Sequence, residues 1–208
     1  MNTLVCLDRD GTLICEDKYH LGSQKDWKKK VKIIPHVIKG IKELNKIKNL
    51  KIYMITNQPG VAVKEFKLLT NKKADEVCRY VVNKFKQKGA KIHGYYFCPH
   101  ASKEFAKSHP QYPFDKSKLD QCNCMKPKSG MIQKALKHSK LKNPNIYVAG
   151  DRCTDVEAAL KMKGSGVLIP FKTEPGQRAK TKKLKGKAFI KKNFSEFVKL
   201  IKNDQKNN

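Results

Sequence analysis

The fold is decided by the stretch TLVCLDRDGT at residues 3–12. Its first half, residues 3–7, is a short apolar run that is typical of a buried β-strand. The run ends abruptly at Asp8, Asp10 and Gly11, a polar turn that carries two carboxylates. A buried strand that ends in charged side chains predicts a functional site at the carboxyl end of a sheet.

Downstream, short apolar runs alternate with longer segments of helical periodicity. Each run is rich in Val, Ile, Tyr or Phe and is bounded by turn-forming residues, which favours strands. The expected strands are residues 3–7, 51–56, 92–98, 145–150, 166–169 and, as a last edge, 187–190. Apolar spacing predicts helices at residues 37–47, 74–85 and 194–201. This alternation predicts an α/β fold with a largely parallel sheet and helices on both faces.

Two polar segments interrupt the alternation. The first lies within an insertion expected at residues 98–124, and the second, residues 171–187, is rich in lysine. The second segment is expected to be a long, mobile basic loop. We expect a single domain over residues 1–203, followed by a polar tail at 204–208 that frays.

The charge of the chain is strongly positive. Its 208 residues include 46 Lys and Arg against 18 Asp and Glu, a formal net charge of +28, which would suit a nucleic-acid partner. Only four of the cations are arginine, however, and nucleic-acid surfaces usually recruit arginine. Lysine spread over solvated faces is therefore the favoured interpretation. No apolar run approaches the ~18 residues of a membrane span or resembles a signal peptide, so we expect a soluble, cytoplasmic protein.

Polar residues also end other strands of the predicted sheet. The second strand ends at Thr56, and the fourth is followed by Asp151 and Asp155. Because the carboxyl ends of parallel strands meet at one edge, these groups should converge with the two aspartates of the first strand. Lys126 precedes another helix and can project a cation into the same crevice.

The residue types in this crevice point to phosphoryl transfer. Several carboxylates repel one another unless a cation lies among them, and Mg²⁺ is the natural partner of oxygen ligands. A hydroxyl and an ammonium group would bind a phosphoryl group. One aspartate can attack phosphorus to form an aspartyl-phosphate, and its neighbour two residues on, on the same face of the strand, can move the proton. Each fragment alone is also compatible with an ordinary turn, cap or loop.

A second constellation consists of soft metal ligands. Its members are Cys98, His100, Cys122 and Cys124. A Cys₃His set suits tetrahedral Zn²⁺ at a structural site, which would tie down a loop with little apolar material of its own. Two unrelated pairs of reduced thiols are the alternative, and His109 is an alternative ligand. The other histidines, His20 among them, are interpreted as surface or packing residues. Seven cysteines without a secretion signal argue against a disulfide framework.

Together the motifs resemble those of the haloacid dehalogenase (HAD) superfamily of phosphatases, from residue 3 to about residue 170. The matching residues are Asp8, Asp10, Gly11, Thr12, Thr56, Lys126, Pro127, Gly150, Asp151 and Asp155. The resemblance implies a Rossmann-like HAD fold with a minimal cap. It implies Asp8 as the nucleophile and Asp10 as the general acid and base, with Thr56 and Lys126 as phosphate stabilisers. Mg²⁺ would be held by Asp8, the backbone carbonyl of Asp10 and Asp151, with Asp155 in support.

The zinc loop directly before the motif lysine narrows the resemblance. It is similar to that of the D-glycero-D-manno-heptose-1,7-bisphosphate phosphatases and the related histidinol-phosphate phosphatases, and residues 56–62, TNQPGVA, resemble a run of the heptose branch. By resemblance, the substrate pocket would be lined by Glu16, Asp17, Lys18, Tyr19, Asn57, Gln58, Pro59, Met125 and Arg152. Met125 departs from the family, which usually has an arginine there that helps recognise the sugar phosphate.

The sequence therefore predicts a Mg²⁺-dependent phosphomonoesterase that acts through an aspartyl-phosphate on a small phosphorylated metabolite. Heptose bisphosphate is the leading substrate, and histidinol phosphate is the alternative. A polynucleotide 3′-phosphatase would suit the charge, but such enzymes are not expected to carry this zinc loop. A non-catalytic basic binding module is opposed by the intact motifs. We expect a monomer, because no apolar stripe lacks an assigned core role.

Overall fold

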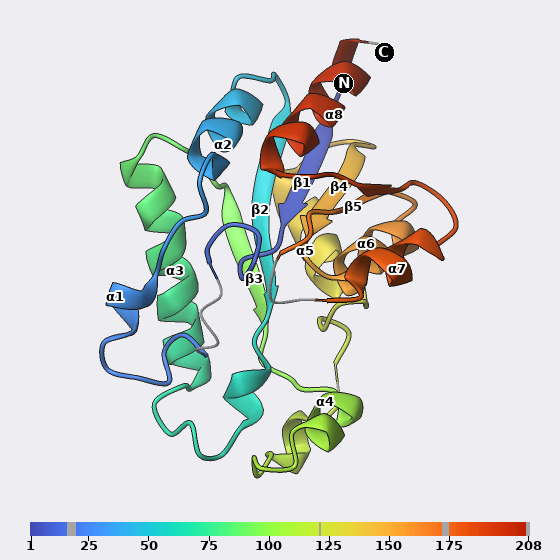
Figure 1. The fold of residues 1–208 in the computed structure, drawn as a ribbon. Coiled ribbons are helices and arrows are strands. Elements are labelled where there is room, and N and C mark those ends of the chain that lie inside the picture. Colours follow the sequence, from blue (N-terminus) through green and yellow to red (C-terminus); the bar gives the residue numbers. More distant parts are fainter. Residues whose placement is uncertain (16–19, 121, 172–174, 207–208) are drawn as a thin grey trace.

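A six-stranded parallel sheet forms the centre of the protein. The computed structural model describes residues 1–15, 20–120, 122–171 and 175–206. The strand order is β3-β2-β1-β4-β5-β6, and every neighbouring pair is parallel (Figure 1). The strands are β1 (Thr3–Leu7), β2 (Leu50–Asn57), β3 (Gly94–Cys98), β4 (Asn145–Gly150), β5 (Ser165–Leu168) and β6 (Ala188–Ile190). The predicted α/β fold is confirmed, and each expected strand is found.

Strand β1 lies between β2 and β4 and is buried along its whole length. Val5 and Leu7 belong to the apolar core on one face of the sheet, whereas Leu4 and Cys6 belong to the core on the other face. A strand covered on both faces has no polar side to alternate with, which explains the continuous apolar run in the sequence. The backbone N–H of Asp8 still donates to Ala149 O at 2.9 Å, so the ladder leads directly into the first motif.

Helices cover the sheet in two layers. One face is covered by α2 (Val37–Asn45), α3 (Asn71–Gln87) and α8 (Phe194–Lys206), and the other by α5 (Gly130–Ser139) and α6 (Cys153–Lys161) (Figure 1). The shorter elements are α1 (Trp27–Lys30), α4 (Lys103–Ser108), α7 (Gln177–Lys182) and the 3₁₀ turns η1 (Pro59–Ala62) and η2 (Lys116–Lys118). Among the described residues, no helix is long and apolar enough to cross a bilayer.

The lysine-rich segment at residues 171–187 was expected to be a mobile loop, and this prediction is wrong for its centre. Helix α7 forms there, and Thr181 is its buried residue. One buried side chain in a six-residue helix leaves no apolar periodicity in the sequence, so the pattern gave no signal.

The tail expected to fray at residues 204–208 is helical at residues 204–206, so this prediction is wrong there, and residues 207–208 lie outside the described residues. Helix α8 continues to Lys206. The Tyr147 hydroxyl donates to Asp204 Oδ2 at 2.7 Å, and Gln205 Nε2 donates to Thr3 Oγ1 at 2.7 Å. These side-chain hydrogen bonds fasten the end of the helix to strands β4 and β1.

The insertion after β3 contains more apolar contact than the sequence suggested. The Phe105 ring of α4 lies 4.1 Å from the His109 ring and 6.0 Å from Phe114. Tyr112 lies 5.3 Å from Phe66, a residue outside the insertion. This aromatic cluster fixes α4 beyond the carboxyl ends of the strands, at the end of the molecule opposite the two termini (Figure 1).

Candidate active site and zinc-binding cluster

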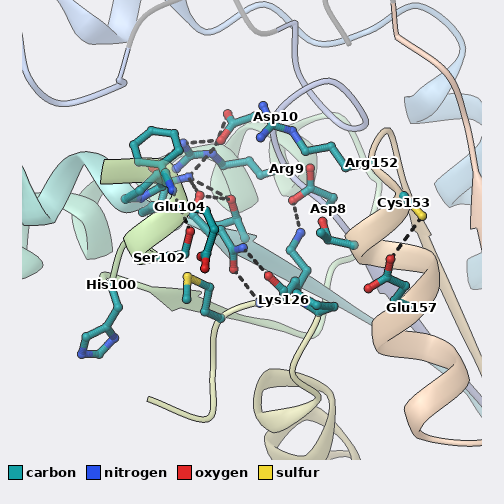
Figure 2. Close-up of a pocket in the computed structure, with 18 of the residues that line it drawn as sticks. Asp8, Arg9, Asp10, His100, Ser102, Glu104, Lys126, Arg152, Cys153 and Glu157 are labelled. Carbon is teal, nitrogen blue, oxygen red and sulfur yellow. Dashed lines mark hydrogen bonds and ion pairs between the residues drawn. The ribbon is translucent and has the colours of Figure 1, made fainter. Parts of the chain in front are cut away.

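Three motif side chains meet at the carboxyl end of β1. Lys126 Nζ lies 2.6 Å from Asp8 Oδ1 (Figure 2). It also lies 2.6 Å from Asp155 Oδ1, and all three side chains are buried. Burial opposes the charge of Lys126, but the two carboxylates raise its pKa above the usual value. The buried ammonium therefore stays charged and balances the carboxylates, which buried charges require.

Asp151 completes a cluster of three carboxylates. Ligand oxygens of Asp8, Asp151 and Asp155 lie within 4.8 Å of one another, and within the described part of the chain both side-chain oxygens of Asp151 are buried without a hydrogen-bond partner. Burial, together with repulsion from Asp8 and Asp155, raises the pKa of Asp151 to about 9. Burial also raises the pKa of Asp8 to about 7. Buried oxygens that lack partners fit a hard divalent cation such as Mg²⁺.

We expect Mg²⁺ to bind more tightly as the pH rises from about 6 to about 9. Protons on Asp8 and Asp151 compete with the cation, so their loss favours binding. The stability of the metal-free protein should change with pH in the opposite direction. Above about pH 4 the folded state holds protons on Asp8 and Asp151 that the unfolded state has lost, so the free energy of unfolding falls as the pH rises. The rise in Tm on adding Mg²⁺, measured at about pH 6 and at about pH 9, checks the predicted pH dependence of binding. An equal rise at the two pH values would contradict it, and Asp151→Asn should weaken the pH dependence.

Gly11 allows the loop after β1 to pass against Asp151. Its φ is +76°, and a Cβ at this position would lie 2.3 Å from Asp151 Oδ2. We expect Gly11→Ala to lower kcat by about 100-fold, because a displaced catalytic group costs roughly that much. Gly89→Ala is the matched control, since φ is +72° there but the nearest atom is the flexible Lys42 side chain at 3.3 Å. Equal losses in the two variants would assign the effect to backbone strain alone.

Asp10 is held by Arg9 and Gln58. Arg9 donates to both Asp10 oxygens, at 2.9 and 2.8 Å, and Gln58 Nε2 donates to Asp10 Oδ2 at 2.9 Å. Although burial opposes ionisation, the Arg9 charge and these hydrogen bonds hold the pKa of Asp10 below its usual value. Arg9 was not predicted to be a site residue, because an arginine between two aspartates is equally well interpreted as an exposed, solvated side chain.

Residues at the carboxyl end of β2 form hydrogen bonds with one another and with the backbone of Lys126. Gln58 Nε2 also donates to Thr56 Oγ1 at 2.8 Å, which fixes the orientation of this buried hydroxyl. Asn57 Nδ2 donates to Lys126 O at 3.1 Å, and Asn57 Oδ1 accepts from Lys126 N at 3.0 Å. The Asn57 amide thus clamps the backbone of the motif lysine. Asn57 and Gln58 line the pocket as expected, but their amides also position other residues.

The predicted zinc ligands are brought together. Cys98 Sγ lies 3.0 Å from Cys124 Sγ, 3.5 Å from Cys122 Sγ and 3.5 Å from His100 Nδ1. Ligands about 2.3 Å from a tetrahedral Zn²⁺ are separated by a little under 4 Å, so the cluster is close to the size that the ion needs. A hydrogen bond with the Cys98 thiol lowers the pKa of Cys124 to about 5. His109 is not part of the cluster and stacks on Phe105 instead.

The Cys/His cluster and the motif lysine share one short segment. Cys124 lies two residues before Lys126, and Lys128 Nζ donates to Cys122 O at 2.7 Å. The backbone N–H of Gly130 donates to Asn123 O at 3.0 Å, and a Cβ on Gly130 would lie 2.3 Å from that same oxygen. The segment is therefore closely packed, and a metal bound by Cys124 would also fix the position of the backbone at Lys126.

A pocket of about 480 Å³ opens over Asp8, Asp10 and Lys126 (Figure 2). The predicted residues Pro59, Met125 and Arg152 line it, whereas the expected substrate loop, residues 16–19, lies outside the described residues. The pocket also includes residues that the sequence analysis missed: His20, Ser102, Glu104, Phe105, Cys153, Glu157, Gln177 and Lys180. Apart from His20, these residues come from the insertion, α6 and α7, and none of them is itself a motif residue. His20 in particular was interpreted as a surface or packing residue.

Comparisons with known sequences agree with this site. The family described as polynucleotide kinase 3 phosphatase matches residues 3–196. The chain is 32% identical over 184 residues to the D-glycero-beta-D-manno-heptose-1,7-bisphosphate 7-phosphatase of Helicobacter pylori, covering 83% of this chain and 88% of that protein. It is 34% identical over 164 residues to the histidine biosynthesis bifunctional protein HisB of Blochmanniella floridana, covering 79% of this chain but only 40% of that protein.

Solved structures share the fold. The D,D-heptose 1,7-bisphosphate phosphatase from B. bronchiseptica, complexed with magnesium and phosphate, matches with a TM-score of 0.74 at 18% identity, covering 97% of this chain and 99% of that one. A haloacid dehalogenase-like hydrolase from Streptococcus pneumoniae matches with a TM-score of 0.56 at 14% identity, covering 96% and 98%.

Proposed function

Since the chain belongs to the HAD family of phosphatases, we propose that it is a Mg²⁺-dependent phosphomonoesterase whose substrate is a small sugar phosphate of the D-glycero-D-manno-heptose 1,7-bisphosphate type. One observation carries the proposal. Lys126 lies between Asp8 and Asp155 under an open pocket, and the nearby carboxylate of Asp151 has no hydrogen-bond partner among the described residues. The heptose-phosphatase relative from Helicobacter pylori, 88% of which is covered, supports the substrate class.

We assign Asp8 as the nucleophile. One of its oxygens attacks phosphorus, the bond between phosphorus and the sugar oxygen breaks, and an aspartyl-phosphate forms. Lys126, bound to Asp8 Oδ1, offsets the negative charge on the phosphoryl oxygens. Water then attacks phosphorus, the bond to Asp8 breaks, and inorganic phosphate leaves with the carboxylate restored.

Asp10 is assigned to the proton transfers. In the observed geometry Arg9 keeps it ionised, which suits a base that takes the proton from the attacking water. To protonate the leaving sugar oxygen in the first step, Asp10 must carry a proton and give up its contact with Arg9. Its side chain is 21% exposed, compared with 8% for Asp8, so it has access to the pocket.

Two metal ions fit the chain. Asp8, Asp151 and the backbone carbonyl of Asp10 would hold Mg²⁺, with Asp155 in support, and the ion would neutralise charge on the transferring phosphoryl group. Cys98, His100, Cys122 and Cys124 would hold Zn²⁺ with all four positions filled, which is a structural site. Its role here would be to fix the segment that carries Lys126.

Two other substrates compete with heptose bisphosphate. Histidinol phosphate is favoured by the 34% identity to the bifunctional histidine protein, of which the chain covers 40%. A 3′-phosphorylated polynucleotide is favoured by the matching family description and the charge of +28.

The deciding experiment compares phosphate release from all three substrates with Mg²⁺. We expect the highest kcat/KM with heptose bisphosphate. A folded protein that releases phosphate from none of them would refute the proposal. A preference for the oligonucleotide that is lost steeply with salt would replace the substrate class.

We also propose a single-domain, monomeric, cytoplasmic enzyme. The two apolar cores lie on opposite faces of one sheet and share strands β1, β2 and β4, which supports one domain. The end of α8 extends this domain from the predicted residue 203 to residue 206. Size-exclusion chromatography with light scattering tests the monomer.

A further inference from the structure

Helices α6 and α7 form one wall of the pocket, and the insertion forms another. Arg152 and Glu157 lie on the first wall and Glu104 lies on the second (Figure 2). Lys180 also belongs to the first wall, and Phe105 to the second. The other two cations of the described pocket are Arg9 and Lys126. Both are buried and paired with catalytic carboxylates, so they are already engaged at the floor.

The packing of α7 against α6 places Lys180 at the pocket. Gln177 Oε1 accepts a hydrogen bond from the backbone N–H of Cys153, the first residue of α6, at 2.8 Å. Thr181 is buried against the rest of the protein. Residues i, i+3 and i+4 share one face of a helix, so Gln177, Lys180 and Thr181 face the same way. Lys182 and Lys183 are exposed and lie outside the pocket lining.

We propose that Lys180 is a specificity-determining residue that binds a second phosphoryl group of the substrate, distinct from the one attacked by Asp8. An exposed ammonium at the pocket rim offers three donors to a phosphate and loses little hydration on binding. Met125 also lines the pocket, but its thioether cannot donate a hydrogen bond. The inference rests on the proposed phosphatase function and adds the residue that selects bisphosphorylated sugars.

The test uses two substrates that differ only in the second phosphate, heptose 1,7-bisphosphate and heptose 7-phosphate. We expect Lys180→Ala to raise KM for the bisphosphate by about tenfold, with kcat and the monophosphate KM little changed, since one charge-assisted hydrogen bond is worth that much. Lys180→Arg should restore most of the affinity. Lys182→Ala, the matched control on the same helix, should leave both substrates unaffected.

The possible failures are distinguishable. If Lys180→Ala alters both substrates equally, or Lys182→Ala raises KM as much, the effect is general electrostatic attraction and the inference is overturned while the phosphatase function stands. If the folded wild-type enzyme hydrolyses neither substrate, the proposed substrate class fails and the inference fails with it. Thermal unfolding of each variant confirms that the comparison is made on folded protein.

Discussion

Asp8→Asn should reduce phosphatase activity by at least about 10⁴-fold, because removing a catalytic nucleophile typically costs that much or more. The amide cannot attack phosphorus, yet it preserves the volume of the side chain. The variant should fold. Asp8 is buried beside two other carboxylates, and its raised pKa shows that its ionised form is disfavoured in the folded protein. Phosphate release and thermal unfolding, both measured at neutral pH, check the two parts of this prediction.

Asp26→Asn provides the control for Asp8→Asn. The Asp26 side chain is 55% exposed and forms a surface ion pair with Lys30, so its substitution should leave activity unchanged. If Asp8→Asn kept a tenth of the wild-type activity, the chain would hydrolyse phosphate without this nucleophile, and the assignment of the aspartyl-phosphate would be wrong. Trapping of a phosphorylated wild-type protein, absent in the variant, would support the assignment independently.

Cys124→Ser should remove zinc and lower the free energy of unfolding by several kcal/mol. Binding of a structural metal contributes directly to folding, and a loss of about 3 kcal/mol lowers Tm by roughly 6–12 °C in a chain of this size. The activity should fall as well, because Lys126 follows two residues later on the same segment. Zinc content by metal analysis, Tm and kcat are the three measurements.

Cys15→Ser is the matched control for Cys124→Ser. Both thiols are partly buried, but Cys15 lies outside the metal cluster. It should keep its zinc, its Tm and its activity. A Cys124→Ser protein that retains one zinc per chain would point to a different ligand set. A protein that loses zinc without losing stability would contradict the structural role.

The sequence predicts much of the fold and the floor of the site for a physical reason. Strands such as Thr3–Leu7 are buried on both faces, so their apolar runs are visible without knowledge of their neighbours. Asp8, Asp151 and Lys126 come at the ends of such strands or before a helix, and the parallel topology brings them together. Short spacings also led to the proposed zinc ligands, whose side chains the fold brings together at the end of β3.

The walls of the pocket could not be predicted in the same way. Lys180 is one of many lysines, and its position depends on a hydrogen bond between Gln177 and Cys153, residues from two different helices. Glu104 and Phe105 reach the pocket because an aromatic cluster orients α4. Long-range contacts of this kind leave no periodic pattern in the sequence. The polar clamp that Asn57 forms on Lys126 was missed for the same reason.

The central position of β1 has a consequence for the synthesis and folding of the chain. This strand is made first, but one of its two partners is β4, with Thr3 in register with Asn145. Pairing between such distant segments is slow, because a long loop must close before any contact forms. A nascent or truncated chain that stops before β4 carries the proposed nucleophile but lacks Asp151 and Asp155. Phosphatase activity should therefore appear only after β4 and the start of α6 have been made, and shorter products should be inactive.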